Sequence, residues 1–225
     1  MELKYRIGYV DEDSNQVKKY QRRFRKLGFE IIGYEFKKGM SLDELMEQIY
    51  SSDIDLLMID YKLDESNKVT FNGEAVESEI YDTKPLFPHI IFTNKKDDAE
   101  PHVEDWKIIF DKEEIFNEDE DNEDDDRINH FTTTLERSIE QYQKHLQKRK
   151  DHIAVLLEKG KDEKLSPGDK HDLLKLQKEL KVLNPTFEVE VPEYLLLSEN
   201  LTEIEGLKNE AEELLKNLIE NRKNK

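Results

Sequence analysis

Five residues in the first half of the chain have side chains suited to phosphoryl chemistry. They are Asp11, Glu12, Asp60, Thr93 and Lys112, and each lies at the end of a short apolar run. A carboxylate that attacks phosphorus approaches a dianion, so the reaction requires a divalent cation between the nucleophile and the phosphoryl oxygens. Mg²⁺ binds oxygen ligands and keeps several waters, so two or three carboxylates suffice to hold it. A lysine and a threonine could bind the remaining phosphoryl oxygens.

A single aspartate at the end of an apolar run is most often only a turn residue. Here four such runs end on residues of this kind. In an open parallel sheet, ligands bind just beyond the carboxyl ends of the strands, so the four ends would meet in one crevice. This convergence predicts a functional site.

The apolar runs are spaced like the strands of a doubly wound α/β domain. The central run, residues 53–60 (DIDLLMID), is nearly continuous in apolar residues, as is typical of a parallel strand buried on both faces. The other predicted strands are residues 4–10, 29–36, 89–92 and 107–110. Predicted helices alternate with them at about residues 14–27, from residue 41, and at 73–81. The alternation predicts a five-stranded parallel sheet with helices on both faces, a flavodoxin-like arrangement.

Local signals support these boundaries. Ser14 is a suitable N-cap for the first helix, and Gly28 is a suitable stop. The sequence from Ser41 to Glu44 has the form of a capping box at the start of the second helix. Residues 61–72 read as a long polar loop, and Trp106 is expected in the core.

The second half of the chain predicts long helices. An acidic loop at residues 113–126 precedes a helix from residue 127 to about residue 159. Its apolar seam is interrupted at Arg149 and consists of Leu135, Ile139, Tyr142, Leu146, Ile153 and Leu156. A turn at residues 160–168, a helix at 169–183, a short extended segment at 187–191 and a helix at about 198–221 follow. We therefore expect an α/β domain at residues 1–126 and a helical hairpin or bundle at 127–225, which a second chain could complete.

Composition excludes several classes of function. The 225-residue chain has a formal net charge of −18, which argues against a nucleic-acid or anionic-membrane partner. The absence of cysteine excludes disulfides and thiolate metal sites, and is consistent with a reducing compartment. The first residues lack a signal-peptide pattern, and no apolar run approaches membrane-spanning length. We expect a soluble cytoplasmic protein.

With these residues in this order, roughly the first 117 residues resemble the receiver domain of two-component response regulators. The resemblance implies that Asp60 accepts a phosphoryl group from a histidine kinase or a phosphotransfer protein. It also implies that Asp11, Glu12 and Asp60 hold Mg²⁺, with a further ligand from the backbone carbonyl of Lys62. Thr93 and Lys112 match the hydroxyl residue and the lysine that bind the phosphoryl group, and the helix after residue 127 takes the place of the last receiver helix.

The chain departs from the family pattern mainly around the switching residues. Glu113 stands where a proline usually follows the lysine, and Asn94 stands where a small residue usually follows the threonine. Ile109 occupies a position that is usually aromatic, and Gly73 comes about five residues later than the family's loop normally allows. The predicted fourth helix, between residues 93 and 106, is short.

Three functional hypotheses follow. In the first, the chain is an atypical response regulator, not an enzyme. Its phosphorylation on Asp60 by a partner kinase alters how the receiver sits against the C-terminal helices, which signal through contacts with an unknown protein partner. In the second, it is a pseudo-receiver scaffold that binds partners without phosphorylation. In the third, the long helices act alone as a dimeric coiled-coil adaptor. A homodimer through the C-terminal helices is compatible with all three.

Overall fold

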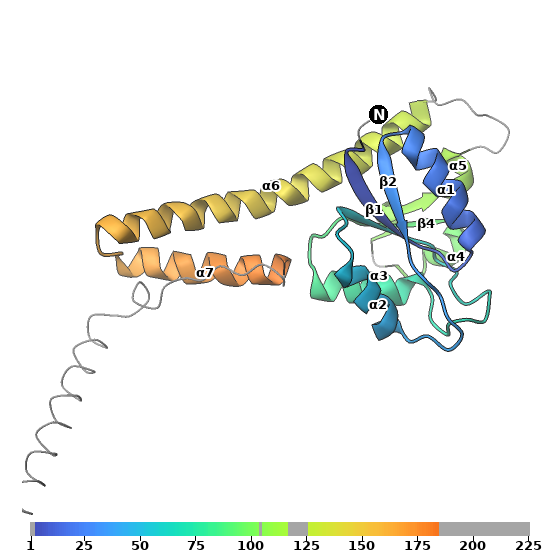
Figure 1. Cartoon of the computed structure of the whole chain (residues 1–225), viewed down its shortest axis with the longest axis horizontal. Helices are drawn as coiled ribbons and strands as arrows, with labels where there is room; N and C mark the ends of the chain where they lie inside the picture. Colours follow the sequence, from blue (N-terminus) through green and yellow to red (C-terminus); the bar gives the residue numbers. More distant parts are fainter. Residues whose placement is uncertain (1–2, 104, 117–125, 185–225) are drawn as a thin grey trace, which may run out of the picture. The chain divides into compact units, whose positions relative to one another are not determined.

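The computed structural model describes residues 3–103, 105–116 and 126–184. Its first half contains a five-stranded sheet in the order β2-β1-β3-β4-β5, with all neighbouring strands parallel; Figure 1 labels strands β1, β2 and β4 of this sheet. The strands are β1 (Tyr5–Val10), β2 (Phe29–Gly33), β3 (Leu56–Ile59), β4 (His89–Thr93) and β5 (Ile109–Asp111). The strand order is that of the flavodoxin-like doubly wound folds, so the predicted fold class is confirmed.

Helices cover both faces of the sheet. They are α1 (Ser14–Lys26), α2 (Leu42–Ser51), α3 (Gly73–Thr83), α4 (Lys96–Ala99), α5 (Lys112–Ile115), α6 (Asp126–Asp162) and α7 (Pro167–Leu183), with a 3-10 turn at Trp106–Ile108. One face packs against α1, α5 and the first part of α6, and the other against α2 and α3. The two faces therefore form two separate apolar clusters.

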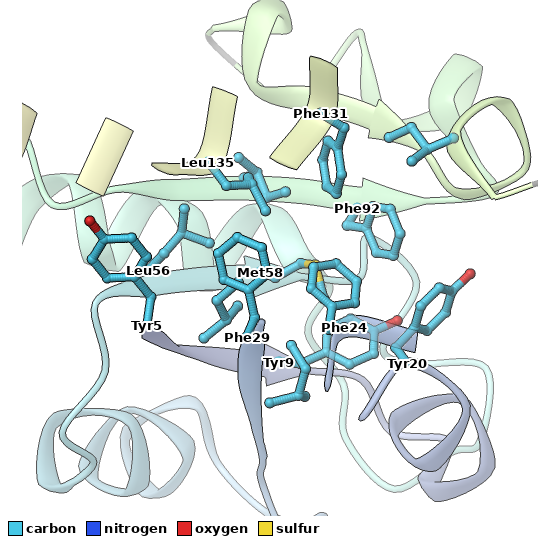
Figure 2. Close-up of a cluster of buried hydrophobic side chains, with 14 of the residues drawn as sticks. Tyr5, Tyr9, Tyr20, Phe24, Phe29, Leu56, Met58, Phe92, Phe131 and Leu135 are labelled. Atoms are coloured by element: carbon cyan, nitrogen blue, oxygen red, sulfur yellow. The ribbon is translucent and has the colours of Figure 1, made fainter. Parts of the chain in front are cut away.

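The cluster under α1 and α6 is rich in aromatic residues. Tyr9 of β1, Phe92 of β4, Tyr20 and Phe24 of α1, and Phe131 of α6 are all buried there (Figure 2). The rings of Tyr20 and Phe92 meet edge to face at 5.0 Å, and those of Phe92 and Phe131 stack at 5.8 Å. Such ring pairs contribute about 0.5–1.5 kcal/mol each beyond the area that they bury. This cluster fixes the position of α6 on the sheet.

Two of the predicted helix boundaries can be compared directly with the structure. Asp13, not Ser14, is the N-cap of α1, because its carboxylate accepts the backbone N–H of Asn15. The capping box of α2 is confirmed: Ser41 Oγ accepts the Glu44 N–H, and the Glu44 carboxylate accepts the Ser41 N–H.

The region before and after β5 differs from the prediction. Residues 106–108 form the 3-10 turn, so β5 begins two residues later than expected and ends at Asp111. Trp106 lies in this turn and is 64% exposed, so its predicted place in the core is wrong. The segment after Lys112 begins as α5 instead of a loop, because Asp111 caps the N–H groups of Glu113 and Glu114. Strand β2 ends at Gly33, three residues earlier than predicted.

The described chain divides into two compact units within α6. The first unit takes in residues up to 148 together with 182–184, and the second takes in residues 149–181. The domain boundary was predicted at residue 126, but the structure divides the chain later. Between these two positions lies the part of α6 that packs on the sheet through Phe131, Leu135 and Ile139. The division falls at Arg149, where the apolar seam of the sequence is interrupted.

The second unit is a helical hairpin, as predicted. Ile153 and Leu156 of α6 are buried, as are Leu173 and Leu180 of α7. Arg149 Nε lies 2.8 Å from a carboxylate oxygen of Glu179, which joins the two helices.

Two predictions for the C-terminal region lie outside the described residues. They are the extended segment at 187–191 and the helix at about 198–221. Among the described helices, none is both long enough and apolar enough to cross a membrane.

Candidate functional site

The carboxyl ends of β1 and β3 lie side by side at the centre of the sheet. Val10 and Ile59 are register partners, so Asp11 and Asp60 leave the sheet together. The Asp60 N–H donates to the Val10 carbonyl at 2.8 Å, which ties the two ends to each other. After β2 is added on one side of β1, the later strands are added on the other side, so the direction of the strand order reverses between β1 and β3. In doubly wound sheets, the ligand crevice lies at this point.

Three predicted metal ligands converge at this crevice. One carboxylate oxygen from each of Asp11, Glu12 and Asp60 lies within 4.8 Å of the others. Three carboxylates that share one small volume repel one another unless a cation or protons neutralise them. Hard oxygen donors at this spacing suit Mg²⁺, which completes its coordination with water. The residues present therefore fit a magnesium ion.

Lys112 lies at the same place. Its Nζ is 3.0 Å from Asp60 Oδ1 and 3.2 Å from Asp11 Oδ2, and the lysine is buried. Because Asp111 caps α5, the helix starts at Lys112 and this side chain leaves its first turn. The ammonium group also lies within 6 Å of three aromatic ring centres, Tyr9 (5.6 Å), Tyr20 (5.9 Å) and Phe92 (5.8 Å).

The protonation of the acidic residues reflects this crowding. Burial raises the pKa of Asp60 to about 6; the Lys112 ammonium opposes the rise and Asp11 adds to it. Burial also raises the pKa of Glu12 to about 7, with further repulsion from Asp11 and Asp60. A bound cation would remove the cause of the repulsion and favour the ionised forms of both groups.

Thr93 ends β4 and is buried, opposite Asp111 in the register with β5. Its Oγ1 accepts the Lys95 N–H at 3.1 Å. A hydrogen bond from Thr93 also acts to lower the pKa of Asp60, so the hydroxyl lies within reach of that carboxylate. All five residues that the sequence singled out are therefore at this edge of the sheet.

The long loop after Asp60 still allows Gly73 to approach the site. A Cβ atom on Gly73 would lie 2.3 Å from the backbone oxygen of Asp60, so no other residue fits without movement. The Gly73 N–H donates to the Tyr61 carbonyl at 2.8 Å. The loop at residues 61–72 holds the extra residues, with Leu63 and Val69 buried, while the glycine keeps its contact with the strand end.

Sequence reasoning missed two polar contacts of the site. Tyr9 donates its hydroxyl to Asp11 Oδ2 at 2.5 Å, and Lys68 donates to the Glu12 carbonyl at 2.9 Å. Tyr9 lies two residues before Asp11, and strand periodicity places both residues on the same face of the sheet. This spacing could have indicated the contact between Tyr9 and Asp11. Lys68 lies in the loop at residues 61–72, where the sequence carries no periodic signal. The backbone carbonyl of Lys62 as a metal ligand stays a prediction.

Two of the departures from the receiver pattern, Asn94 and Glu113, contact each other. Asn94 Nδ2 donates to Glu113 Oε1 at 3.2 Å, which joins the loop after β4 to the start of α5. Both residues are exposed. Ile109 is buried in the cluster under α2 and α3, so this usually aromatic position carries an aliphatic side chain.

Comparison with known proteins gives a consistent picture of the fold. No family model and no curated protein matches the chain. The similar solved structures are mostly receiver domains of response regulators. The resemblance seen in the sequence is therefore also found among solved structures. Because the sequence identities are below 20%, this similarity concerns the fold.

One similar structure is the response regulator TrrA from Thermotoga maritima in complex with Mg²⁺ and BeF. It is 19% identical, has a TM-score of 0.41, and the match covers 59% of this chain and 99% of that one. A CheY-like response regulator receiver domain protein from Methanospirillum hungatei JF-1 is 15% identical, with a TM-score of 0.40 and coverage of 62% and 98%. A third structure holds TrrA with the histidine kinase ThkA, at 19% identity, a TM-score of 0.41 and coverage of 59% and 98%.

Proposed function

We propose that the chain is a phosphoacceptor of the two-component type, phosphorylated on Asp60. The observation that carries the proposal is the contact of one buried ammonium group, that of Lys112, with both Asp60 (3.0 Å) and Asp11 (3.2 Å). A lysine in this position neutralises carboxylates in the absence of a ligand and is placed to bind phosphoryl oxygens when they arrive.

The proposed reaction transfers a phosphoryl group from a phosphohistidine. A carboxylate oxygen of Asp60 forms a bond to phosphorus while the phosphorus–nitrogen bond breaks. The imidazole nitrogen leaves with the bonding electrons and takes a proton from solvent. Lys112 and the Thr93 hydroxyl bind the phosphoryl oxygens, which carry the charge that develops during transfer.

The cation would be held by Asp11, Glu12 and Asp60. When bound, Mg²⁺ neutralises charge on the phosphoryl oxygens and the attacking carboxylate. The protein's own contribution is to keep the three carboxylates within 4.8 Å of one another. Lys112, in contact with both Asp60 and Asp11, contributes positive charge there.

The test is phosphoryl uptake by the full chain. With Mg²⁺ and acetyl phosphate, intact mass should increase by one phosphoryl group, and Asp60→Asn should abolish the increase. A matched control is Asp55→Asn, which changes an aspartate just before the same strand, at its amino end, and should leave uptake unchanged. Absence of uptake by the unmodified chain, or uptake that persists in Asp60→Asn, would defeat the proposal.

The proposed phosphodonor is a histidine kinase or a phosphotransfer protein, and the output is protein–protein contact by the C-terminal helices. The first part of α6 supports this route. Phe131 of α6 stacks on Phe92, which directly precedes Thr93, and its ring lies 5.2 Å from that of Phe110. A movement of Thr93 or Lys112 would thus alter the packing under α6. Sedimentation of the full chain with and without phosphorylation would show whether the helices form a homodimer.

A phosphorylation-independent scaffold is the second candidate function. The observation that favours it is the Asn94–Glu113 hydrogen bond, because Glu113 directly follows Lys112 and its carboxylate would repel an incoming phosphoryl group. A scaffold of this kind should bind its partner equally well with Asp60→Ala, whereas a signalling receiver should not.

A further inference from the structure

Tyr9 is a buried phenol that points at a proposed metal ligand. It lies in β1, is fully buried, and places its hydroxyl 2.5 Å from Asp11 Oδ2. Alternate residues of a strand face the same side, so the ring lies in the aromatic cluster and the hydroxyl reaches along the strand to Asp11. Packing fixes the ring: it meets Tyr20 at 5.7 Å and Phe92 at 6.2 Å, both edge to face (Figure 2).

The hydrogen bonds of Asp11 restrict where this carboxylate can bind a cation. Oδ2 accepts from the Tyr9 hydroxyl and from Lys112 Nζ, and Oδ1 accepts from the Asp13 N–H at 2.9 Å. An ionised carboxylate offers about four lone-pair sites, so three donors leave about one, on Oδ1. The carboxylate is thus held in a single orientation before any ligand binds.

Of the two side-chain donors to Oδ2, Tyr9 has less freedom to move than Lys112. Lys112 has a flexible stem and shares its ammonium group with Asp60, so its contact with Asp11 would weaken when it binds a phosphoryl group. The Asp13 N–H belongs to the turn that starts α1. The phenol has a rigid ring in a packed cluster, and its hydroxyl can hold Oδ2 while the lysine is engaged elsewhere.

We propose that Tyr9 is a positioning residue for the divalent cation: its hydroxyl orients Asp11 so that the free lone pair of Oδ1 faces the crevice. The inference rests on the proposed function, because it assigns a role within the same site. Groups that hydrogen-bond to metal ligands typically change metal affinity 10–100-fold when they are removed. A residue with only a packing role would not affect the cation, because phenylalanine fills nearly the same space.

The experiment compares Tyr9→Phe with Tyr50→Phe in the full chain. Tyr50 pairs its hydroxyl with Thr83 in α3 and is absent from the site, so its variant loses a tyrosine hydrogen bond elsewhere in the same domain. Mg²⁺ affinity is measured by titration calorimetry, and the rate of phosphoryl uptake from acetyl phosphate is measured as a function of Mg²⁺ concentration. Thermal unfolding without Mg²⁺ establishes that each variant is folded.

Tyr9→Phe should raise the dissociation constant for Mg²⁺ about tenfold, and Tyr50→Phe should not change it. At saturating Mg²⁺ the uptake rate of Tyr9→Phe should return to within about twofold of the unmodified chain, because the loss is in cation binding. An unchanged Mg²⁺ affinity in folded Tyr9→Phe would overturn the inference. If Tyr9→Phe does not fold, Tyr9→Trp, which keeps an aromatic ring without this hydroxyl, takes its place under the same criteria. If the unmodified chain neither binds Mg²⁺ nor takes up phosphoryl groups, the proposed function fails first.

Discussion

The site has a buried half and an exposed rim, and the two are built differently. The buried half consists of Asp11, Asp60 and Lys112, which come from three strand ends; Lys112 Nζ lies 3.2 Å from Asp11 and 3.0 Å from Asp60. The rim consists of Asn94 and Glu113, which are exposed and joined by one hydrogen bond of 3.2 Å. The buried half matches the receiver pattern at every position, and the rim departs from it at both.

The comparison indicates which residues can change without loss of the site. In the buried half, a missing partner would leave a charge uncompensated in a region of low dielectric constant, which costs several kcal/mol. On the rim, water replaces a lost partner, so the cost is small. We therefore expect the chemistry to be fixed by the buried half and the access of partners and phosphodonors to be adjusted at the rim.

The largest effect is expected for Lys112→Met. The variant leaves Asp60 and Asp11 without their ammonium partner, so the free energy of unfolding in metal-free buffer near neutral pH should fall by about 3 kcal/mol. Phosphoryl uptake should fall about 10²-fold, because a donor to the phosphoryl oxygens is lost. Denaturant unfolding and intact mass over time provide the measurements.

Lys96→Met is the matched control for this change. Lys96 Nζ lies 3.5 Å from Glu114 on the surface, so its loss should cost less than about 0.5 kcal/mol. Equal destabilisation by the two lysine variants would remove the distinction between the buried half and the surface.

Gly73→Ala should have the next largest effect. Its Cβ would lie 2.3 Å from the Asp60 backbone oxygen, and overpacking of this kind costs about 1–3 kcal/mol. The strand end would have to shift, so phosphoryl uptake should also fall. Gly168→Ala is the control, since its nearest neighbour, Ser166 Oγ, is 3.7 Å away; it should be neutral or stabilising. An unaltered midpoint of thermal unfolding in Gly73→Ala would show that the glycine contact is not required.

The pH dependence of stability tests the buried half without any phosphodonor. The pKa of Asp60 rises from 3.8 in the unfolded chain to about 6 in the folded chain, so the folded state holds this proton more tightly. The resulting contribution to stability is fully present below about pH 4 and is lost as pH rises through about 6. Glu12 acts in the same direction, up to about pH 7.

The measurement is the difference in unfolding free energy between the unmodified chain and Asp60→Asn, in EDTA, from pH 4 to pH 7. The unmodified chain should lose stability relative to Asp60→Asn as pH rises, and excess Mg²⁺ should reverse the loss at pH 7. A flat difference, or no effect of Mg²⁺, would mean that the carboxylates do not share a cation site.

The smallest effects are expected on the rim. Glu113→Gln removes a negative charge near the path of an incoming phosphodonor, so phosphoryl uptake should become about two- to fivefold faster at low salt. Asn94→Ala should change stability by less than about 0.5 kcal/mol. If the Glu113→Gln rate does not respond to salt, then the carboxylate does not act through charge.

Much of the fold and most of the site could be predicted from the sequence, because both depend on local patterns. Continuous apolar runs identify buried parallel strands, and their alternation with amphipathic helices implies the doubly wound sheet. Since parallel strands present their carboxyl ends at one edge, Asp11, Asp60, Thr93 and Lys112 could be placed together before any coordinates were known. The domain boundary was predicted at residue 126, whereas the two compact units divide at Arg149, where the apolar seam is interrupted.

Errors arose where tertiary contacts override local pattern. Trp106 is apolar and adjacent to a strand, yet the 3-10 turn before β5 leaves it 64% exposed. The acidic segment after Lys112 begins as a helix because Asp111 caps it and because Ile115 and Phe116 are buried against the aromatic cluster. In neither case does the local sequence indicate which residues from elsewhere in the chain will pack against the segment.

The sequence by itself determined which side chains stand at the strand ends, because strand identity depends on residues close together in the chain. The tertiary structure decided what those side chains touch. The hydrogen bond from Tyr9 to Asp11, the reach of Lys68 to the Glu12 carbonyl and the meeting of Asn94 with Glu113 depend on rotamers and loop paths. These are set by packing among residues far apart in sequence, and no periodicity encodes them.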